Sequence, residues 1–183
     1  MKVINLWGGP GCGKSTTATG LFSLMKMRGH KVELVTEYAK ELTYEKNWEM
    51  LKCQDLILPE QYNRQKRLVG HVDFIITDSP LPLNLIYARD DLRVSFGFWN
   101  RVLDFFDEFD NFNVMIKRVK PYSHYGRKET DTEAVNIDSE CVLLLNNIKA
   151  KYHWVRGDED SPVIIYNMLF NNYEIKLNEV KNG

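Results

Sequence analysis

The chain has 183 residues, 44% of them hydrophobic and 27% charged, and its formal net charge is −1. This balance is ordinary for a globular protein with its own core, and it excludes a protein that coats nucleic acid with a broad basic face. No apolar run approaches the roughly 18 residues of a membrane-spanning helix, and the first residues lack the pattern of a signal peptide, so we expect a cytoplasmic protein.

Short apolar runs alternate along the chain with stretches of helical periodicity. The first run, "VINLW", stops at glycines, which is typical of a buried parallel strand. A helix with a basic last turn follows and ends before Gly29. After the second strand, Thr36 is expected to cap a helix that starts at Glu37. Residues 43–55 give no clear pattern, and Pro59 is expected in the first turn of the next helix.

The later part of the chain repeats this alternation. Thr130 and Glu133 have the spacing of a capping box, which predicts a helix behind them. The expected strands are 3–7, 31–35, 72–78, 112–119 and 152–158. The expected helices are 14–28, 37–42, 59–69, 97–109, 134–150 and 161–170. This order favours a parallel sheet with helices on both faces. We therefore expect an α/β three-layer sandwich with a mainly parallel five-stranded sheet, built as one domain over residues 1–183.

The glycine-rich segment "GGPGCGKST" lies between the first strand and the first helix. It fits the pattern G-x-x-x-x-G-K-[ST], in which backbone N–H groups and the helix N-terminus form a site for phosphate. The lysine reaches the β- and γ-phosphates and the hydroxyl binds Mg²⁺. The sequence therefore predicts a nucleoside triphosphate site, with Ser15 as a metal ligand. Its residues are Gly9, Gly11, Cys12, Gly13, Lys14, Ser15 and Thr16.

Two acidic residues follow predicted strands. Asp78 ends the third strand, where a carboxylate can hold the metal or accept a proton. Glu37 follows the second strand, and ligands of open α/β sheets gather at this edge, so Glu37 is a candidate base or anchor for the acceptor hydroxyl. A strand-end turn for Asp78, and a favourable dipole contact for Glu37, are the structural alternatives.

Basic residues concentrate in the loop 117–132, which we expect to act as a lid over the phosphates. Arg127 is its strongest candidate for charge neutralisation, and Arg118 is a candidate substrate contact. In the helix before the third strand, Gln61 and Arg64 lie at three-residue spacing, together with Arg67. Such a stripe can grip a base edge and a phosphate. For both groups the alternative is a solvated surface.

Aromatic residues recur at helical spacing in the stretch 97–109. Such a stripe predicts packing in a core or an interface. If it were exposed, it would suit a nucleotide-switched regulator that binds a partner protein.

Five segments carry a resemblance that extends over nearly the full length of the chain: "INLWGGPGCGKSTTATGLF", "VELVTEYAKEL", "EQYNRQKRL", "DFIITDSPL" and "KPYSHYGRKETDTEA". They resemble small P-loop ATP-binding proteins of bacteriophages, which are similar to nicotinamide riboside kinase and, more distantly, to thymidylate kinases. The resemblance implies the P-loop NTPase fold of such kinases, with ATP and Mg²⁺ as cofactors. It implies phosphate and metal roles for Lys14 and Ser15, and a strand-end acid role for Asp78. It also implies a lid role for Arg127, and a place near the acceptor for Glu37 and Tyr38.

Some relatives of this kind phosphorylate 5-hydroxymethyluracil in DNA, and others act on free nucleosides or nucleotides. The leading hypothesis is a kinase that moves the γ-phosphoryl group of ATP to a nucleoside-type hydroxyl, with 5-hydroxymethyluridine in phage DNA favoured. The alternatives are a kinase of nicotinamide riboside or a deoxynucleoside monophosphate, and a nucleotide-switched ATPase without a small acceptor. A phage protein would act in the host cytoplasm. Glu37 and Asp78 remain alternatives as the base.

Overall fold

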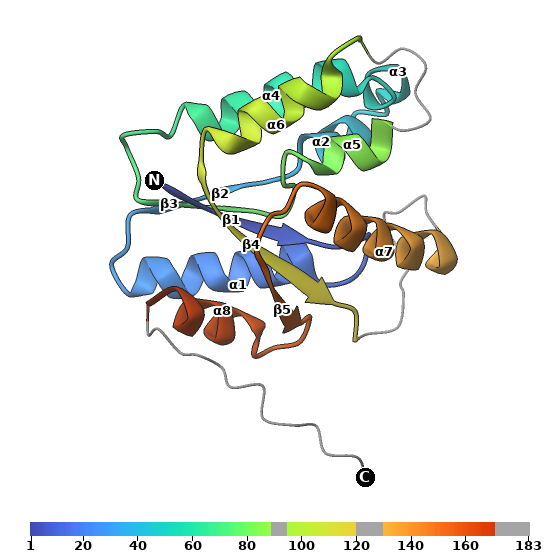
Figure 1. The fold of residues 1–183 in the computed structure, drawn as a ribbon. Coiled ribbons are helices and arrows are strands. Elements are labelled where there is room, and N and C mark those ends of the chain that lie inside the picture. The colour runs from blue at the N-terminus through green and yellow to red at the C-terminus, as the bar shows by residue number, and fades with distance from the viewer. Residues whose placement is uncertain (89–94, 120–129, 171–183) are drawn as a thin grey trace.

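Five strands form one parallel sheet in the order β2-β3-β1-β4-β5 (Figure 1). The computed structural model describes residues 1–88, 95–119 and 130–170. The strands are β1 (Lys2–Trp7), β2 (Val32–Val35), β3 (Phe74–Thr77), β4 (Asp110–Lys117) and β5 (Tyr152–Arg156). Every neighbouring pair is parallel. The predicted sheet is confirmed, and it is wholly parallel rather than mainly so.

The helices cover both faces of this sheet. They are α1 (Lys14–Met27), α2 (Tyr38–Tyr44), α3 (Trp48–Leu51), α4 (Gln54–Lys66), α5 (Leu83–Ala88), α6 (Phe98–Asp107), α7 (Asp131–Asn147) and α8 (Ser161–Phe170). One core cluster joins alternate strand residues to α1 and α8, and the other joins the opposite strand residues to α4, α5, α6 and α7 (Figure 1). The predicted three-layer α/β sandwich is therefore confirmed.

Helix α4 differs from its prediction, because it begins at Gln54 and carries Pro59 in its interior. A proline inside a helix loses one hydrogen bond and costs stability. Here the cost is offset by packing, since one face of the helix is buried on both sides of the proline. That face consists of Gln54, Ile57, Leu58, Gln61 and Gln65. Because three of these residues are glutamines, the sequence looked polar where the structure has a core.

The start of α2 is also different. Its N-cap is Glu37 rather than Thr36, and the Glu37 side chain makes no capping hydrogen bond.

At α7 the predicted capping box is present: the Thr130 hydroxyl accepts from the Glu133 N–H, and the Glu133 carboxylate accepts from the Thr130 N–H. This helix begins directly at Asp131, inside the box. Strand β4 begins two residues earlier than predicted, where Asp110 lies opposite Lys2 in the sheet register.

The aromatic stripe of α6 packs into the core. Phe98, Val102 and Phe106 are at most 5% exposed, and Phe109, just beyond the helix, is 9% exposed. The prediction of packing is confirmed, so this stripe gives no support to a regulator that binds a partner through it.

In residues 1–88, 95–119 and 130–170, no helix has the length and apolarity needed to cross a membrane.

Candidate active site

The predicted site residues gather at one edge of the sheet. Because all strands are parallel, the segments that follow them emerge on the same side. The glycine loop follows β1, Glu37 follows β2 and Asp78 follows β3. Strand β3 pairs directly with β1, so Asp78 lies beside the glycine loop. Ligands of open α/β sheets bind at such carboxyl ends.

The glycine loop leads straight into α1. Gly11 and Gly13 have φ of 79° and 113°, values that favour glycine and allow the chain to curl there. Gly13 is the N-cap of α1 and supplies no side-chain cap. The first N–H groups of a helix have no intrahelical partner, and the helix dipole adds partial positive charge there. The geometry can hold an anion at Gly13, Lys14, Ser15 and Thr16.

The Lys14 ammonium lies over this loop. Nζ donates to the carbonyls of Gly8, at 2.7 Å, and of Gly9, at 3.0 Å. Burial alone would lower the pKa of Lys14, but the acidic groups around it, among them Cys12 and Glu37, raise that pKa above its ordinary value. Lys14 is therefore charged at neutral pH, and a role in binding phosphate would require this charge. Cys12 itself is buried and fills space in the loop.

Ser15 and Asp78 form a pair of oxygen donors. The Ser15 hydroxyl donates to Oδ2 of Asp78 at 2.5 Å. The other oxygen, Oδ1, is buried and has no hydrogen-bond partner among the described residues. A hydroxyl and a carboxylate are hard ligands of the kind that Mg²⁺ prefers, usually completed by phosphate oxygens and water. These two residues fit a magnesium ion that accompanies a triphosphate.

A cavity of about 290 Å³ lies between α1, the end of β2, and α2. The structure brings Ser15, Glu37 and Asp78 together in its lining. Sequence reasoning missed three further lining residues, Lys40, Glu41 and Tyr44. They follow Glu37 at intervals of three, four and seven residues, which is the spacing of one helix face. That spacing was the signal that could have found them.

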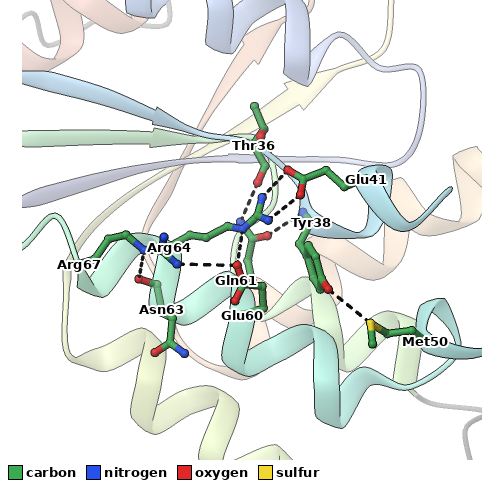
Figure 2. Close-up of polar contacts among 9 residues, drawn as sticks. All are labelled: Thr36, Tyr38, Glu41, Met50, Glu60, Gln61, Asn63, Arg64 and Arg67. Carbon is green, nitrogen blue, oxygen red and sulfur yellow. Dashed lines mark hydrogen bonds and ion pairs between the residues drawn. The ribbon is translucent and has the colours of Figure 1, made fainter. Parts of the chain in front are cut away.

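Three predicted substrate contacts, Tyr38, Gln61 and Arg64, lie outside the lining of this cavity. Gln61 is 1% exposed, so a solvated face is wrong for it. The side-chain amide of Gln61 forms hydrogen bonds with the backbone on both sides of Glu37 (Figure 2). The Tyr38 hydroxyl donates to the Met50 sulfur. Arg64 binds Glu41 through two hydrogen bonds. The side chains of Gln61 and Arg64 hold α2 against α4, and the Tyr38 hydroxyl reaches α3 through Met50.

Arg118 is held at the end of β4 by a residue that sequence reasoning missed. Asp138 on α7 accepts from Nε of Arg118 at 3.0 Å and from the N–H of Gly9 at 2.5 Å. Both carboxylate oxygens are used, and they connect the base of the predicted lid to the glycine loop. Nothing in the local sequence distinguishes Asp138 from other helix-surface acids. Arg127 and most of the predicted lid lie outside the described residues.

The close packing of the glycine loop on α7 gives a stability prediction. A Cβ on Gly9 would lie 2.3 Å from the Ala134 carbonyl oxygen and 3.0 Å from Oδ1 of Asp138. Because a backbone oxygen cannot move aside cheaply, we expect Gly9→Ala to lower the free energy of unfolding by about 1–3 kcal/mol. Urea denaturation measures this difference. A variant as stable as the wild type would show that the loop does not rest on α7.

Comparisons with known proteins identify the fold. In solved structures, the chain is similar to a deoxyadenosine kinase from M. mycoides with bound dATP, with a TM-score of 0.52 and 19% identity over 92% of this chain and 99% of that one. It is also similar to the NadR protein in complex with NR, with a TM-score of 0.65 and 16% identity over 99% of this chain. The chain spans about half of that NadR chain, 54%.

At these identities the likeness concerns the fold alone, and it confirms the P-loop kinase fold predicted from the sequence. No curated protein matches the sequence significantly. The sequence model of a family described as "AAA domain" matches residues 3–161, which include the glycine loop, Glu37 and Asp78. The match covers most of the chain, and the protein therefore belongs to the AAA domain family.

Proposed function

We propose that the protein is an ATP-dependent kinase that transfers the γ-phosphoryl group to a hydroxyl of a nucleoside-type acceptor. The observation that carries this proposal is the position of the 290 Å³ cavity. It is bounded by Ser15 at the start of α1, so it adjoins the glycine loop, and its lining includes Glu37 and Asp78. A regulator that only binds and hydrolyses nucleotide has no need of an acidic cavity beside its phosphate loop. The deoxyadenosine kinase and NadR likenesses agree with this class of enzyme.

In the proposed reaction, the acceptor oxygen forms a bond to the γ-phosphorus while the bond from that phosphorus to the β–γ bridging oxygen breaks. ADP leaves, and the hydroxyl proton passes to a carboxylate. Because Asp78 already pairs with Ser15, we assign Asp78 to the metal site and Glu37 to the hydroxyl. A magnesium ion bound by Ser15 and Asp78 would neutralise charge on the phosphate oxygens. Lys14 and Arg127 would stabilise the charge on the transferred group.

The first candidate acceptor is 5-hydroxymethyluridine in phage DNA, which follows from the sequence resemblance. Basic residues near the site could grip a DNA backbone although the whole protein carries a net charge of −1. Arg67, whose side chain is 62% exposed at the end of α4, is suited to this contact, whereas Arg118 is mostly buried and already paired with Asp138.

The second candidate is a free nucleoside, and the charge of the cavity favours it. Three carboxylates, those of Glu37, Glu41 and Asp78, line the cavity against one ammonium, that of Lys40. Arg64 neutralises Glu41 only in part, because it also binds Glu60. Such a lining repels an acceptor that brings its own phosphate, and it tolerates an uncharged or cationic nucleoside. Nicotinamide riboside and free 5-hydroxymethyluridine both meet this condition.

The test offers labelled ATP with four acceptors: free 5-hydroxymethyluridine, nicotinamide riboside, a deoxynucleoside monophosphate and a DNA oligomer that contains 5-hydroxymethyluridine. If DNA is the acceptor, raising NaCl from about 50 to about 200 mM should lower its phosphorylation at least about tenfold, because phosphate contacts release counterions. Transfer to a free nucleoside should change by less than about twofold over the same range. Hydrolysis of ATP with no transfer to any of the four would contradict the proposed function and favour a nucleotide-switched ATPase.

A further inference from the structure

The buried amide of Gln61 holds the backbone on both sides of Glu37. Its Oε1 accepts from the N–H of Tyr38 at 2.9 Å, and its Nε2 donates to the carbonyl of Thr36 at 3.3 Å (Figure 2). The Thr36 carbonyl belongs to the peptide unit before Glu37, and the Tyr38 N–H belongs to the peptide unit after it. One side chain therefore fixes both peptide units that meet at the Cα of Glu37.

This contact also satisfies a backbone N–H at the start of α2. Glu37 is the N-cap of α2, and the first N–H groups of a helix need partners from outside the helix. A side chain that caps a helix accepts from the second or third of them, which in α2 belong to Ala39 and Lys40. Here Gln61 satisfies the Tyr38 N–H, and the Glu37 carboxylate makes no capping hydrogen bond. Glu37 instead lines the cavity with Asp78.

A second contact from the same face of α4 fixes the next turn of α2. Arg64 binds the two oxygens of Glu41 at 2.5 and 2.6 Å, and its Nε donates to Glu60 at 2.9 Å. Its guanidinium carbon also lies 4.7 Å from the centre of the Tyr38 ring. The hydrogen bonds from Arg64 lower the pKa of Glu41, so this ion pair persists at neutral pH. Gln61 and Arg64 together dock α2 on α4 (Figure 2).

We propose that Gln61 is a positioning residue for Glu37: it orients the carboxylate that faces the acceptor hydroxyl, without touching the acceptor itself. The inference rests on the proposed function of Glu37. It assigns to Gln61 a role different from the base contact predicted from the sequence, since both of its amide atoms are used by the backbone.

The test compares Gln61→Met with Gln65→Met. Both residues are buried glutamines of α4, each 1% exposed, but the Gln65 Nε2 has no hydrogen-bond partner among the described residues. Rates are measured with whichever acceptor the wild type phosphorylates fastest among free 5-hydroxymethyluridine, nicotinamide riboside and the modified DNA oligomer. We expect Gln61→Met to lower kcat at least about tenfold while KM for ATP stays within about twofold. Gln65→Met should leave both constants within about twofold.

A double-mutant cycle with Glu37→Gln separates positioning from general damage. If Gln61 acts through Glu37, then Gln61→Met should change kcat and the affinity for the acceptor by less than about twofold in the Glu37→Gln background. An equal loss of kcat in both backgrounds, or an unchanged kcat in Gln61→Met, would overturn the inference about Gln61. The proposed function would still stand, because the wild type would remain an active kinase. A wild type that phosphorylates no acceptor would overturn the proposed function and this inference together.

Gln61→Leu keeps the test readable if Gln61→Met does not fold. Leucine removes both the acceptor for the Tyr38 N–H and the donor to the Thr36 carbonyl, and it adds no buried charge. We expect this variant to fold, as measured by circular dichroism, and to lose kcat in the same pattern. A folded Gln61→Leu with full kcat would contradict the inference.

Discussion

Lys14→Ala is expected to lower the rate of phosphoryl transfer at least about a hundredfold, the scale found when one preorganised electrostatic group is removed from an active site. The ammonium lies over the glycine loop and donates to two of its carbonyls. A triphosphate would offer it stronger, charged partners. Because charge develops on the transferred group in the transition state, the loss should fall mainly on kcat. Steady-state kinetics with labelled ATP measure it.

Lys26→Ala is the matched control for this prediction. Lys26 lies on the same helix, α1, and forms an exposed ion pair with Glu33. We expect it to keep the wild-type rate within about twofold, because surface ion pairs contribute little. Full transfer activity in Lys14→Ala would show that the glycine loop is not the phosphate site.

Asp78→Asn should lower kcat by about two to three orders of magnitude and raise the magnesium concentration needed for activity. The substitution keeps the shape of the side chain and an acceptor for the Ser15 hydroxyl, but it removes the charge that would hold the metal. Thermal stability should not fall, because the wild type buries a carboxylate oxygen that has no partner among the described residues. Such an oxygen costs about 1–3 kcal/mol in the folded protein. A loss of activity at constant or higher Tm would mark Asp78 as a functional residue.

Asp73→Asn provides the comparison, since Asp73 precedes the same strand, β3, and is exposed. Its activity and magnesium dependence should match those of the wild type. If Asp78→Asn needed no more magnesium than Asp73→Asn, the metal role of Asp78 would be wrong.

The sequence predicted the sheet and the glycine loop because both depend on local patterns. The apolar runs of β1 and β3 each end at a break, glycines after Trp7 and a Ser-Pro pair after Asp78. The parallel topology then follows from their alternation with helices. Glu37 and Asp78 could be brought to one edge on the same reasoning, because the ends of parallel strands share that edge.

The remaining features depend on contacts between distant segments. Helix α4 begins before Pro59 because glutamines such as Gln61 are buried against other elements, and a polar residue gives no periodic signal for burial. The bridge that Asp138 makes between Gly9 and Arg118 joins residues 129 and 20 positions away from it. Local patterns cannot supply such pairings. They arise only when α7 packs beside the loop.

The most direct test of the account is a crystal structure with magnesium and a non-hydrolysable ATP analogue. We expect the triphosphate to lie in the loop formed by residues 8–16, with the Lys14 ammonium turned from the carbonyls of Gly8 and Gly9 to the β- and γ-phosphates. The metal should contact Ser15 and lie beside Asp78. A structure with the nucleotide bound elsewhere, and with Lys14 still on those two carbonyls, would contradict the central claim.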